Sequence, residues 1–283
     1  MAKTSAAEKI VDEPHLPAVQ DLGVPAEFGD DLGQFAGAGV SDRQEDFQLP
    51  FLAIAQGLSP QIKRQQADKY IPGLEEGDIF NTATGQFWKG ETGLLVVPAF
   101  FQKAMVEWIP RNQGGGYVAT HDIDTPLLKE CRLVDVGEGK QSLRHKNGHD
   151  FVDTSYHFVT LAETGESAVV GMTSTNLGSS RTWQTIQKNI KVPVGGQLIV
   201  APCFSRVFRL RTAYKQKDNN AWFVYSVSDE GWALPLYRAA YEESKKTFVY
   251  ASEHGAQIGR PPEGINSNDT TAGAPDLSGE API

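Results

Sequence analysis

The sequence contains only two cysteines, Cys131 and Cys203, among its 283 residues. Two thiols so far apart in the chain cannot build a disulfide framework or a zinc knuckle, so we interpret them as buried thiols of a reducing compartment. No stretch approaches the roughly 18 apolar residues that a membrane-spanning helix requires. The first residues lead into acidic positions without an apolar run, so no secretory signal peptide is expected. These absences predict a cytoplasmic protein without a membrane partner.

Motifs of common catalytic chemistry are also missing. The chain has no GxxxxGK[ST] loop, no GxGxxG after a strand, no GxSxG turn and no HExxH sequence. The glycine run 114–116 is not followed by the helix that a phosphate cradle needs. We therefore predict a binding protein that is not an enzyme and uses no cofactor.

Five potential metal ligands lie close together in the sequence: His145, His149, Asp150, Asp153 and His157. Their spacing would permit metal binding if the side chains converged. However, Lys146-Asn147-Gly148 is typical of a hairpin tip, which would separate the two leading histidines. We favour a solvated loop over a metal site here.

Acidic residues are concentrated at the two ends of the chain. Residues 1–46 hold three basic residues against ten acidic ones, and residues 261–283 hold four acidic residues and no basic one. The central residues 47–260 carry a net charge of +2, although the whole chain carries −9. Because apolar residues are sparse in both ends, we predict disordered acidic tails on either side of one folded domain at 47–260.

Between the tails, the hydrophobic pattern is mainly that of β-strands. Pro98 suggests a bend or an edge position in its strand, and apolar residues at helical spacing predict helices over 174–190 and 235–252. We expect a β-rich α+β fold, either an OB-like barrel or a strongly curved antiparallel sheet with two helices. The expected strands are 79–81, 86–88, 93–98, 100–109, 117–119, 131–136, 156–162, 167–172, 197–211 and 221–227, and 51–58 is either a strand or a short helix.

The most informative absence is an acid-free segment. Residues 167–217 contain no Asp or Glu but eight basic residues, with aromatic residues interleaved and continuing to Tyr225. Lys and Arg can follow the phosphates of a nucleic acid, and bases stack on aromatic rings at about 1–3 kcal/mol each. A basic, aromatic-rich β-surface is what a single-strand binder needs.

The predicted nucleic-acid contacts fall into two groups. The main group contains Arg181, Lys188, Lys191, Arg206, Arg209, Arg211, Lys215 and Lys217, with Phe208, Tyr214 and Trp222 for stacking. A second, weaker patch around the glycine run contains Lys103, Trp108, Arg111 and Tyr117. A plainer interpretation stands beside this one. Trp183 at helical spacing fits a core position better than a stacking platform, Phe204 and Phe208 fit either role, and the arginines could form a solubilising face or pair with the tails.

Several pieces of the sequence resemble a family of tailed-bacteriophage early-region proteins. The shared pieces are IAQGLSP at 54–60, GDIFNTATG at 77–85, VVP, VEWIPR and GGGYV within 96–118, STNL at 174–177, RTW at 181–183, FSRVF at 204–208 and NNAWF at 219–223. The resemblance covers about residues 47–250. It implies an OB-like fold that binds single-stranded DNA, but it assigns no stacking residue.

We therefore predict a phage single-stranded DNA-binding protein of replication or recombination, located in the host cytoplasm. Its acidic C-terminal tail could recruit replication or recombination proteins, and a homo-oligomer is compatible with this role. One alternative is a virion or assembly protein, which predicts stable symmetric oligomers. A second is an enzyme or an inhibitor of host defence with a site near His145–His157, which predicts a bound metal.

Overall fold

A computed structural model describes residues 49–256, apart from residues 67, 138–139 and 218–219. The predicted tails, 1–46 and 261–283, lie outside the described residues. In chain order the described strands and α-helices are β1 (Phe51–Ile54), β2 (Ile79–Asn81), β3 (Phe87–Trp88), β4 (Leu94–Ile109), β5 (Gly116–Asp122), β6 (Cys131–Gly137), β7 (Lys140–His145), β8 (Asp150–Leu161), β9 (Ser167–Thr173), α2 (Leu177–Asn189), β10 (Lys191–Val194), β11 (Gln197–Val200), β12 (Arg206–Lys217), β13 (Asn220–Trp232) and α3 (Arg238–His254).

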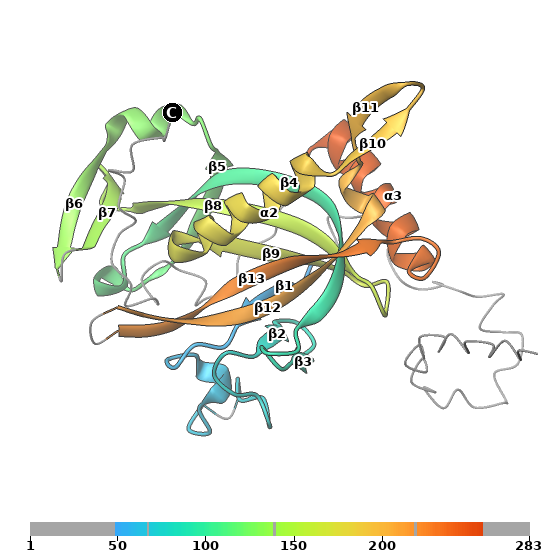
Figure 1. Cartoon of the computed structure of the whole chain (residues 1–283). Coiled ribbons are helices and arrows are strands. Elements are labelled where there is room, and N and C mark those ends of the chain that lie inside the picture. Colours follow the sequence, from blue (N-terminus) through green and yellow to red (C-terminus); the bar gives the residue numbers. More distant parts are fainter. Residues whose placement is uncertain (1–48, 67, 138–139, 218–219, 257–283) are drawn as a thin grey trace, which may run out of the picture. The chain divides into compact units, whose positions relative to one another are not determined.

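Eleven of these strands form one sheet in the order β13-β12-β4-β8-β9-β1-β2-β3, with β5 beside β4 and β6–β7 beside β8. Figure 1 shows that the sheet curls strongly, with α2 lying against it. The predicted β-rich fold with a strongly curved sheet and two helices is therefore confirmed. The pairing is mixed, because β1 and β9 run parallel while the other neighbours are antiparallel.

Side chains close the outer edge of β13. The side-chain amide of Gln56 donates to Phe223 O at 2.8 Å and accepts from Phe223 N at 2.9 Å, as a neighbouring strand would. Asn176 Oδ1 accepts from Tyr225 N at 2.8 Å, and Ser179 Oγ donates to Tyr225 O at 2.5 Å. These bonds satisfy backbone groups that an open edge would leave unpaired. The β13 edge of the curled sheet is thus joined to the start of α2 and to the residues that follow β1.

The main core lies between α2 and the curled sheet. Trp183 is fully buried, and its ring stacks on His157 with the ring centroids 4.3 Å apart. Phe208 of β12 is also fully buried, and its ring centroid lies 5.7 Å from that of the same indole. Trp183 is a core residue, as its helical spacing indicated, and it fixes α2 on the sheet.

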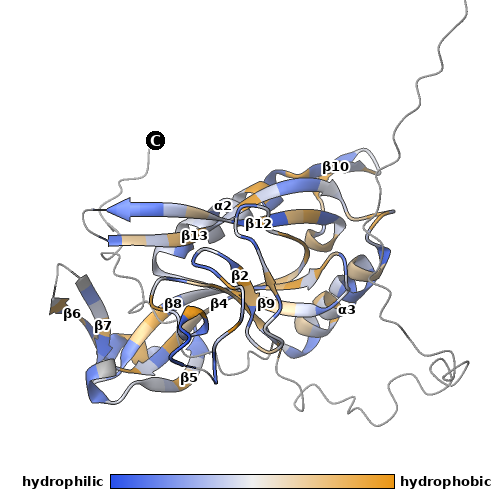
Figure 2. Cartoon of the chain, turned by 90° about the horizontal axis from the view of Figure 1, so that it is seen from below, coloured by the Kyte–Doolittle hydropathy of each residue, from blue (hydrophilic) through white to orange (hydrophobic). Residues whose placement is uncertain are grey.

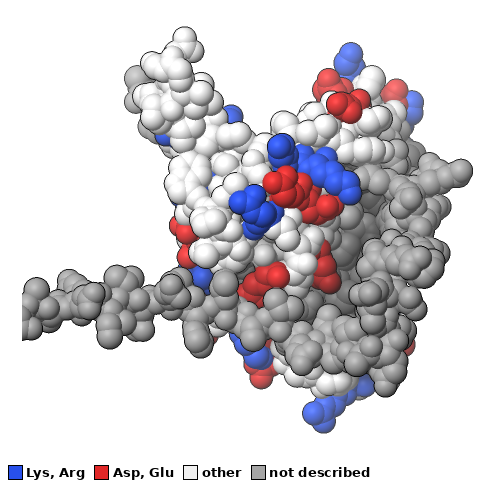
Figure 3. All heavy atoms as spheres, turned by 90° about the vertical axis from the view of Figure 1, so that its right-hand side faces the viewer, with Lys and Arg blue, Asp and Glu red and all other residues white. Residues whose placement is uncertain are grey.

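Helix α3 packs on the other side of β4. Ala240 is fully buried there, and Ser244 Oγ lies 2.8 Å from Thr160 Oγ1 and 3.1 Å from Val97 O. The face seen in Figure 3, where the right-hand side of Figure 1 faces the viewer, carries Lys and Arg next to Asp and Glu. That face is therefore not dominated by charge of one sign.

Three sequence expectations are refined by the fold. The run 51–58 forms a strand, β1, only over Phe51–Ile54. Pro98 lies in β4 at a bulge, as its predicted bend requires, and is paired with Val159 of β8. The single strand expected over 197–211 is wrong, because 203–205 form a 3₁₀ turn and β11 pairs with β10 in a separate hairpin. No helix among the described residues is long and apolar enough to span a bilayer.

Candidate nucleic-acid interface

A row of basic side chains follows one face of the β12–β13 hairpin. Arg211, Lys215 and Lys217 occupy alternate positions of β12 and are exposed. Alternate residues of a strand share one face, so these three define what we call the basic row. In Figure 2, the hairpin end of β12 and β13 is hydrophilic, whereas β4, β8 and β9 include hydrophobic stretches.

The residues of β13 opposite the basic row carry no charge. Lys215 is paired with Trp222, Arg211 with Ser226 and Lys217 with Asn220. Directly opposed residues in an antiparallel pair lie on the same face of the sheet. No ion pair joins the basic row to an acidic side chain among the described residues. The row is therefore a positive strip with one aromatic neighbour.

The other two arginines predicted on β12 are neutralised. Arg206 forms an ion pair with Asp229, with Nε 3.0 Å from Oδ1, and its guanidinium lies 4.4 Å from the ring centre of Trp232. Arg209 Nε lies 3.3 Å from Glu230 Oε1. Both acids come from β13, just beyond the acid-free segment. These pairs leave Arg206 and Arg209 less available to a phosphate than the basic row.

The predicted stacking residues separate into three environments. Phe208 is fully buried against Trp183, so it cannot stack on a base without leaving the core, and we correct that prediction. Tyr214 is 56% exposed and lies on the opposite face of β12 from the basic row, touching the Phe223 ring. Trp222 is partly buried beside Lys215. Trp222 is thus the aromatic residue that accompanies the basic row.

Arg181 and Lys188 of α2 are exposed, as is Lys191 at the start of β10. Arg181 and Lys188 are seven residues apart and so share one side of the helix. That side differs from the one that faces β13, where Ser179 and Thr182 lie. These three cations are therefore not part of the basic row.

The second predicted patch does not form a stacking surface. Trp108 is buried, with its ring edge-on to Tyr117 at 5.7 Å, so we correct its predicted exposure to bases. The Tyr117 hydroxyl lies 3.1 Å from Thr120 Oγ1, and Lys103 Nζ lies 3.1 Å from Asp153 Oδ2. Arg111 begins a 3₁₀ turn. The described members of this patch serve packing and ion pairing.

The histidine cluster does not converge on a metal site. Each member has its own partner: His145 with Glu130, His149 with Glu107, Asp150 with Arg144, Asp153 with Lys103 and His157 with Ser180. Among the described residues, no group of three or more His, Cys, Asp or Glu side chains could hold a metal. The expected turn at 146–148 is present, but His145, Asp150 and His157 are buried, so the solvated-loop interpretation is wrong for these three residues.

Glu107 is the centre of a polar network next to that turn. Burial acts to raise the pKa of Glu107, but hydrogen bonds from His149, His121 and Asn147 outweigh it and the pKa lies below its usual value. The Glu107 carboxylate oxygens lie 2.6 Å from His149 Nδ1 and 2.8 Å from His121 Nε2. The network ties β4, β5 and the 146–148 turn together, which is a structural role.

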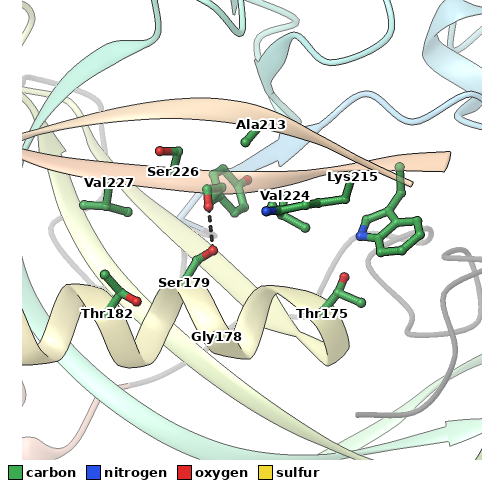
Figure 4. Close-up of a pocket in the computed structure, with 11 residues that line it drawn as sticks. Thr175, Gly178, Ser179, Thr182, Ala213, Lys215, Val224, Ser226 and Val227 are labelled. Atoms are coloured by element: carbon green, nitrogen blue, oxygen red, sulfur yellow. Dashed lines mark hydrogen bonds between the residues drawn. The ribbon is translucent and has the colours of Figure 1, made fainter. Parts of the chain in front are cut away.

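A groove lies between α2 and β13, and we call it the α2–β13 groove. Its volume is about 550 Å³. Figure 4 shows Thr175, Ser179 and Thr182 on the side toward the strands, with the Ser179 hydrogen bond to β13. The lining residues are Thr175, Gly178, Ser179, Thr182, Ala213, Lys215, Trp222, Val224, Tyr225, Ser226 and Val227.

Lys215 and Trp222 of this groove were among the predicted contacts, but the small residues of its α2 side were not. The α2 side of the lining follows the spacing i, i+3, i+4, i+7 at 175, 178, 179 and 182. Small residues at this spacing leave space along one side of a helix, so the stripe indicated a groove there. Tyr225 also lines the groove, and burial raises the pKa of its hydroxyl, which donates to Leu52 O at 2.7 Å.

Comparison with known proteins gives one informative result. Neither the curated proteins nor the solved structures provide a match. The family described as Pam3 phage gp34-like protein matches residues 20–256, which is most of the chain. The predicted membership of a bacteriophage protein family is therefore confirmed at this level: the chain belongs to the Pam3 phage gp34-like protein family.

Proposed function

We propose that the chain binds single-stranded DNA along the β12–β13 hairpin and acts in phage replication or recombination. Binding would be electrostatic and independent of base sequence, and it would involve no covalent chemistry. The observation that carries the proposal is the basic row of Arg211, Lys215 and Lys217, unpaired with described acids and lying next to Trp222. Cations follow the phosphates of a single strand, and an aromatic neighbour supplies a stacking surface.

A titration of the purified full chain with a fluorescent oligo-dT of about 30 nucleotides tests this function. We expect binding to the single strand that weakens steeply with salt, because phosphate contacts release counterions. A duplex of the same length is the control and should bind more weakly, since its bases are not free to stack. A folded protein that does not bind the single strand even at low salt would sink the proposal.

An assembly role is a second candidate because the β10–β11 hairpin exposes apolar side chains. Leu198 is 70% exposed, and Val194, Ile199 and Val200 are exposed as well. Residues 192–205 contain no charged residue, so a second copy meets no charge repulsion there even though the chain carries −9. A two-stranded hairpin is only marginally stable alone. Pairing with another copy would cover it.

The register of the hairpin indicates which edge could pair. Gly195 and Gly196 form a two-residue turn with positive φ, so Val194 and Gln197 are a hydrogen-bonded pair and Leu198 directs its backbone groups outward. Pro193, opposite Leu198, has no N–H and blunts the β10 edge. The β11 edge therefore offers the free backbone groups for antiparallel self-pairing.

If assembly is the function, Leu198→Lys should shift the purified protein from an oligomer to a monomer. A charged side chain on the covered surface would have to be desolvated in the oligomer. Light scattering after gel filtration measures the mass, and Leu58→Lys, at another exposed leucine, is the matched control. A wild-type protein that stays monomeric at about 100 µM would remove the basis for this candidate.

A further inference from the structure

Two polar atoms in the wall of the α2–β13 groove are buried without a partner. Thr175 Oγ1 and Trp222 Nε1 are both inaccessible to solvent, and neither has a hydrogen-bond partner among the described residues. Both residues line the same groove. Buried polar atoms in folded proteins nearly always have a hydrogen-bond partner, so each of these two unpaired atoms needs an explanation. After a small rotation of the two side chains toward the groove, a ligand there would supply both missing hydrogen bonds.

The chemistry of the two unpaired atoms limits what that ligand is. An indole N–H can only donate, so the ligand must present an acceptor toward Trp222. The Thr175 hydroxyl can donate or accept, which allows a ligand edge with acceptors alone or with a neighbouring donor. The edge of every nucleobase carries such acceptors. The two unpaired atoms therefore fit a planar group with a polar edge.

The rest of the lining fits the same kind of group. Ala213, Val224 and Val227 are apolar, and the groove volume of about 550 Å³ lies within the range of small-ligand sites. Gly178 leaves space on the α2 side, because a Cβ built there meets nothing within 4 Å. A phosphate would find few charged partners among these walls. A flat, mostly apolar group fills them better.

Lys215 connects the groove to the basic row. Its side chain lines the groove and belongs to the row of cations on β12. A nucleotide whose base entered the groove could therefore keep its phosphate beside Lys215. Because the bases of a single strand are not paired, one base can turn into the groove while its neighbours continue along the row.

We propose that the α2–β13 groove is a nucleobase subsite that takes one unstacked base of a bound single strand. Trp222 Nε1 and Thr175 Oγ1 hydrogen-bond the edge of that base, and Lys215 contacts its phosphate. All bases offer acceptors, so the subsite requires a base without selecting its sequence. This inference rests on the proposed single-strand binding and names the site that gives it contacts to a base.

The test fills the groove without touching the basic row. Gly178→Leu adds a side chain into the open space, and it does not weaken α2 because glycine is the poorer helix former. Thr185→Leu is the matched control, since it adds a leucine to an exposed position of α2 outside the groove. Each full-length variant is titrated with oligo-dT of about 30 nucleotides and with an abasic oligomer of equal length, which keeps the phosphates and lacks the bases.

We expect the wild-type protein and Thr185→Leu to bind oligo-dT about tenfold more tightly than the abasic oligomer, as stacking and base contacts predict. Gly178→Leu should bind both oligomers with the abasic affinity. Trp222→Phe, which keeps a ring but removes the N–H, should lose part of the preference and provides a second route if Gly178→Leu fails to fold.

The outcomes separate the two proposals. If the wild-type protein binds both oligomers equally, and the groove variants bind like it, the subsite is wrong while single-strand binding stands. If the wild-type protein binds neither oligomer at low salt, the proposed function fails and the subsite fails with it. A preference for oligo-dT that persists in both Gly178→Leu and Trp222→Phe would place the base elsewhere on the protein.

Discussion

Replacing Arg211, Lys215 and Lys217 together by alanine should weaken binding to oligo-dT on the order of 100-fold at about 50 mM salt. Each cation that contacts a phosphate of a single strand releases about 0.7 counterions. Removing three cations should therefore make the negative slope of log K against log salt shallower by about 2. The loss should shrink to almost nothing near about 1 M salt. Titrations across that range measure both the affinity and the slope.

A matched variant separates local contacts from net charge. Arg238, Lys245 and Lys246 are exposed on α3, and their replacement by alanine removes the same +3 from a helix that packs on β4 and β8. This variant should keep the wild-type slope. If both triple variants lose affinity equally, the protein attracts DNA by its general charge and the basic row is not the binding surface.

The placement of the three cations of the basic row on one strand could be predicted because local patterns were sufficient there. Arg211, Lys215 and Lys217 alternate along a run without Asp or Glu, so a strand would place them on one face whatever its partners. The curved, strand-rich fold with two helices followed in the same way from period-two and helical spacings. Both inferences needed only neighbours in the chain.

Local patterns were insufficient where distant residues decide the environment of a side chain. The acid-free segment ends before β13, but antiparallel pairing brings Asp229 and Glu230 back beside Arg206 and Arg209. Phe208 could have been exposed or buried by its pattern alone, and the indole of Trp183 on α2 settled its burial. A short stretch of sequence does not show which other strand will pair with it.

The groove depends on the most distant contacts of all. Its β13 wall is held in place by Gln56, which is 167 residues away from Phe223, and by Asn176 at the start of α2. The parallel pairing of β1 with β9 positions Gln56 for this contact. Small residues at 175, 178, 179 and 182 were visible in the sequence, but only the closed edge of β13 turns them into the wall of a groove.

The stability of the protein should fall with acid because His157 is buried in its neutral form. Burial lowers the pKa of His157 to about 3, from 6.5 in an unfolded chain. Below pH 6.5 the unfolded state therefore binds a proton that the folded state does not, so stability is fully present above that pH and is lost as the pH falls toward about 3. This group alone should cost about 1.4 kcal/mol per pH unit in that window.

His157→Gln isolates this contribution. The amide can still bond to Ser180 Oγ, which lies 2.8 Å from His157 Nε2, but it does not titrate. The variant should be less stable than the wild-type protein at about pH 7, because it loses the ring stacked on Trp183. Its free energy of unfolding should then decline less between about pH 6.5 and about pH 5, so the difference between the two proteins narrows.

Urea denaturation at several pH values gives the two curves, and His254→Gln, at an exposed histidine of α3, serves as the control. All other side chains are present in both proteins, so their contributions cancel in the comparison. Parallel curves for the wild-type protein and His157→Gln would mean that His157 takes up its proton in the folded state. The indole of Trp183 and Ser180 would then have to tolerate a buried imidazolium, and the packing of α2 on the sheet would be looser than the 4.3 Å ring stacking implies.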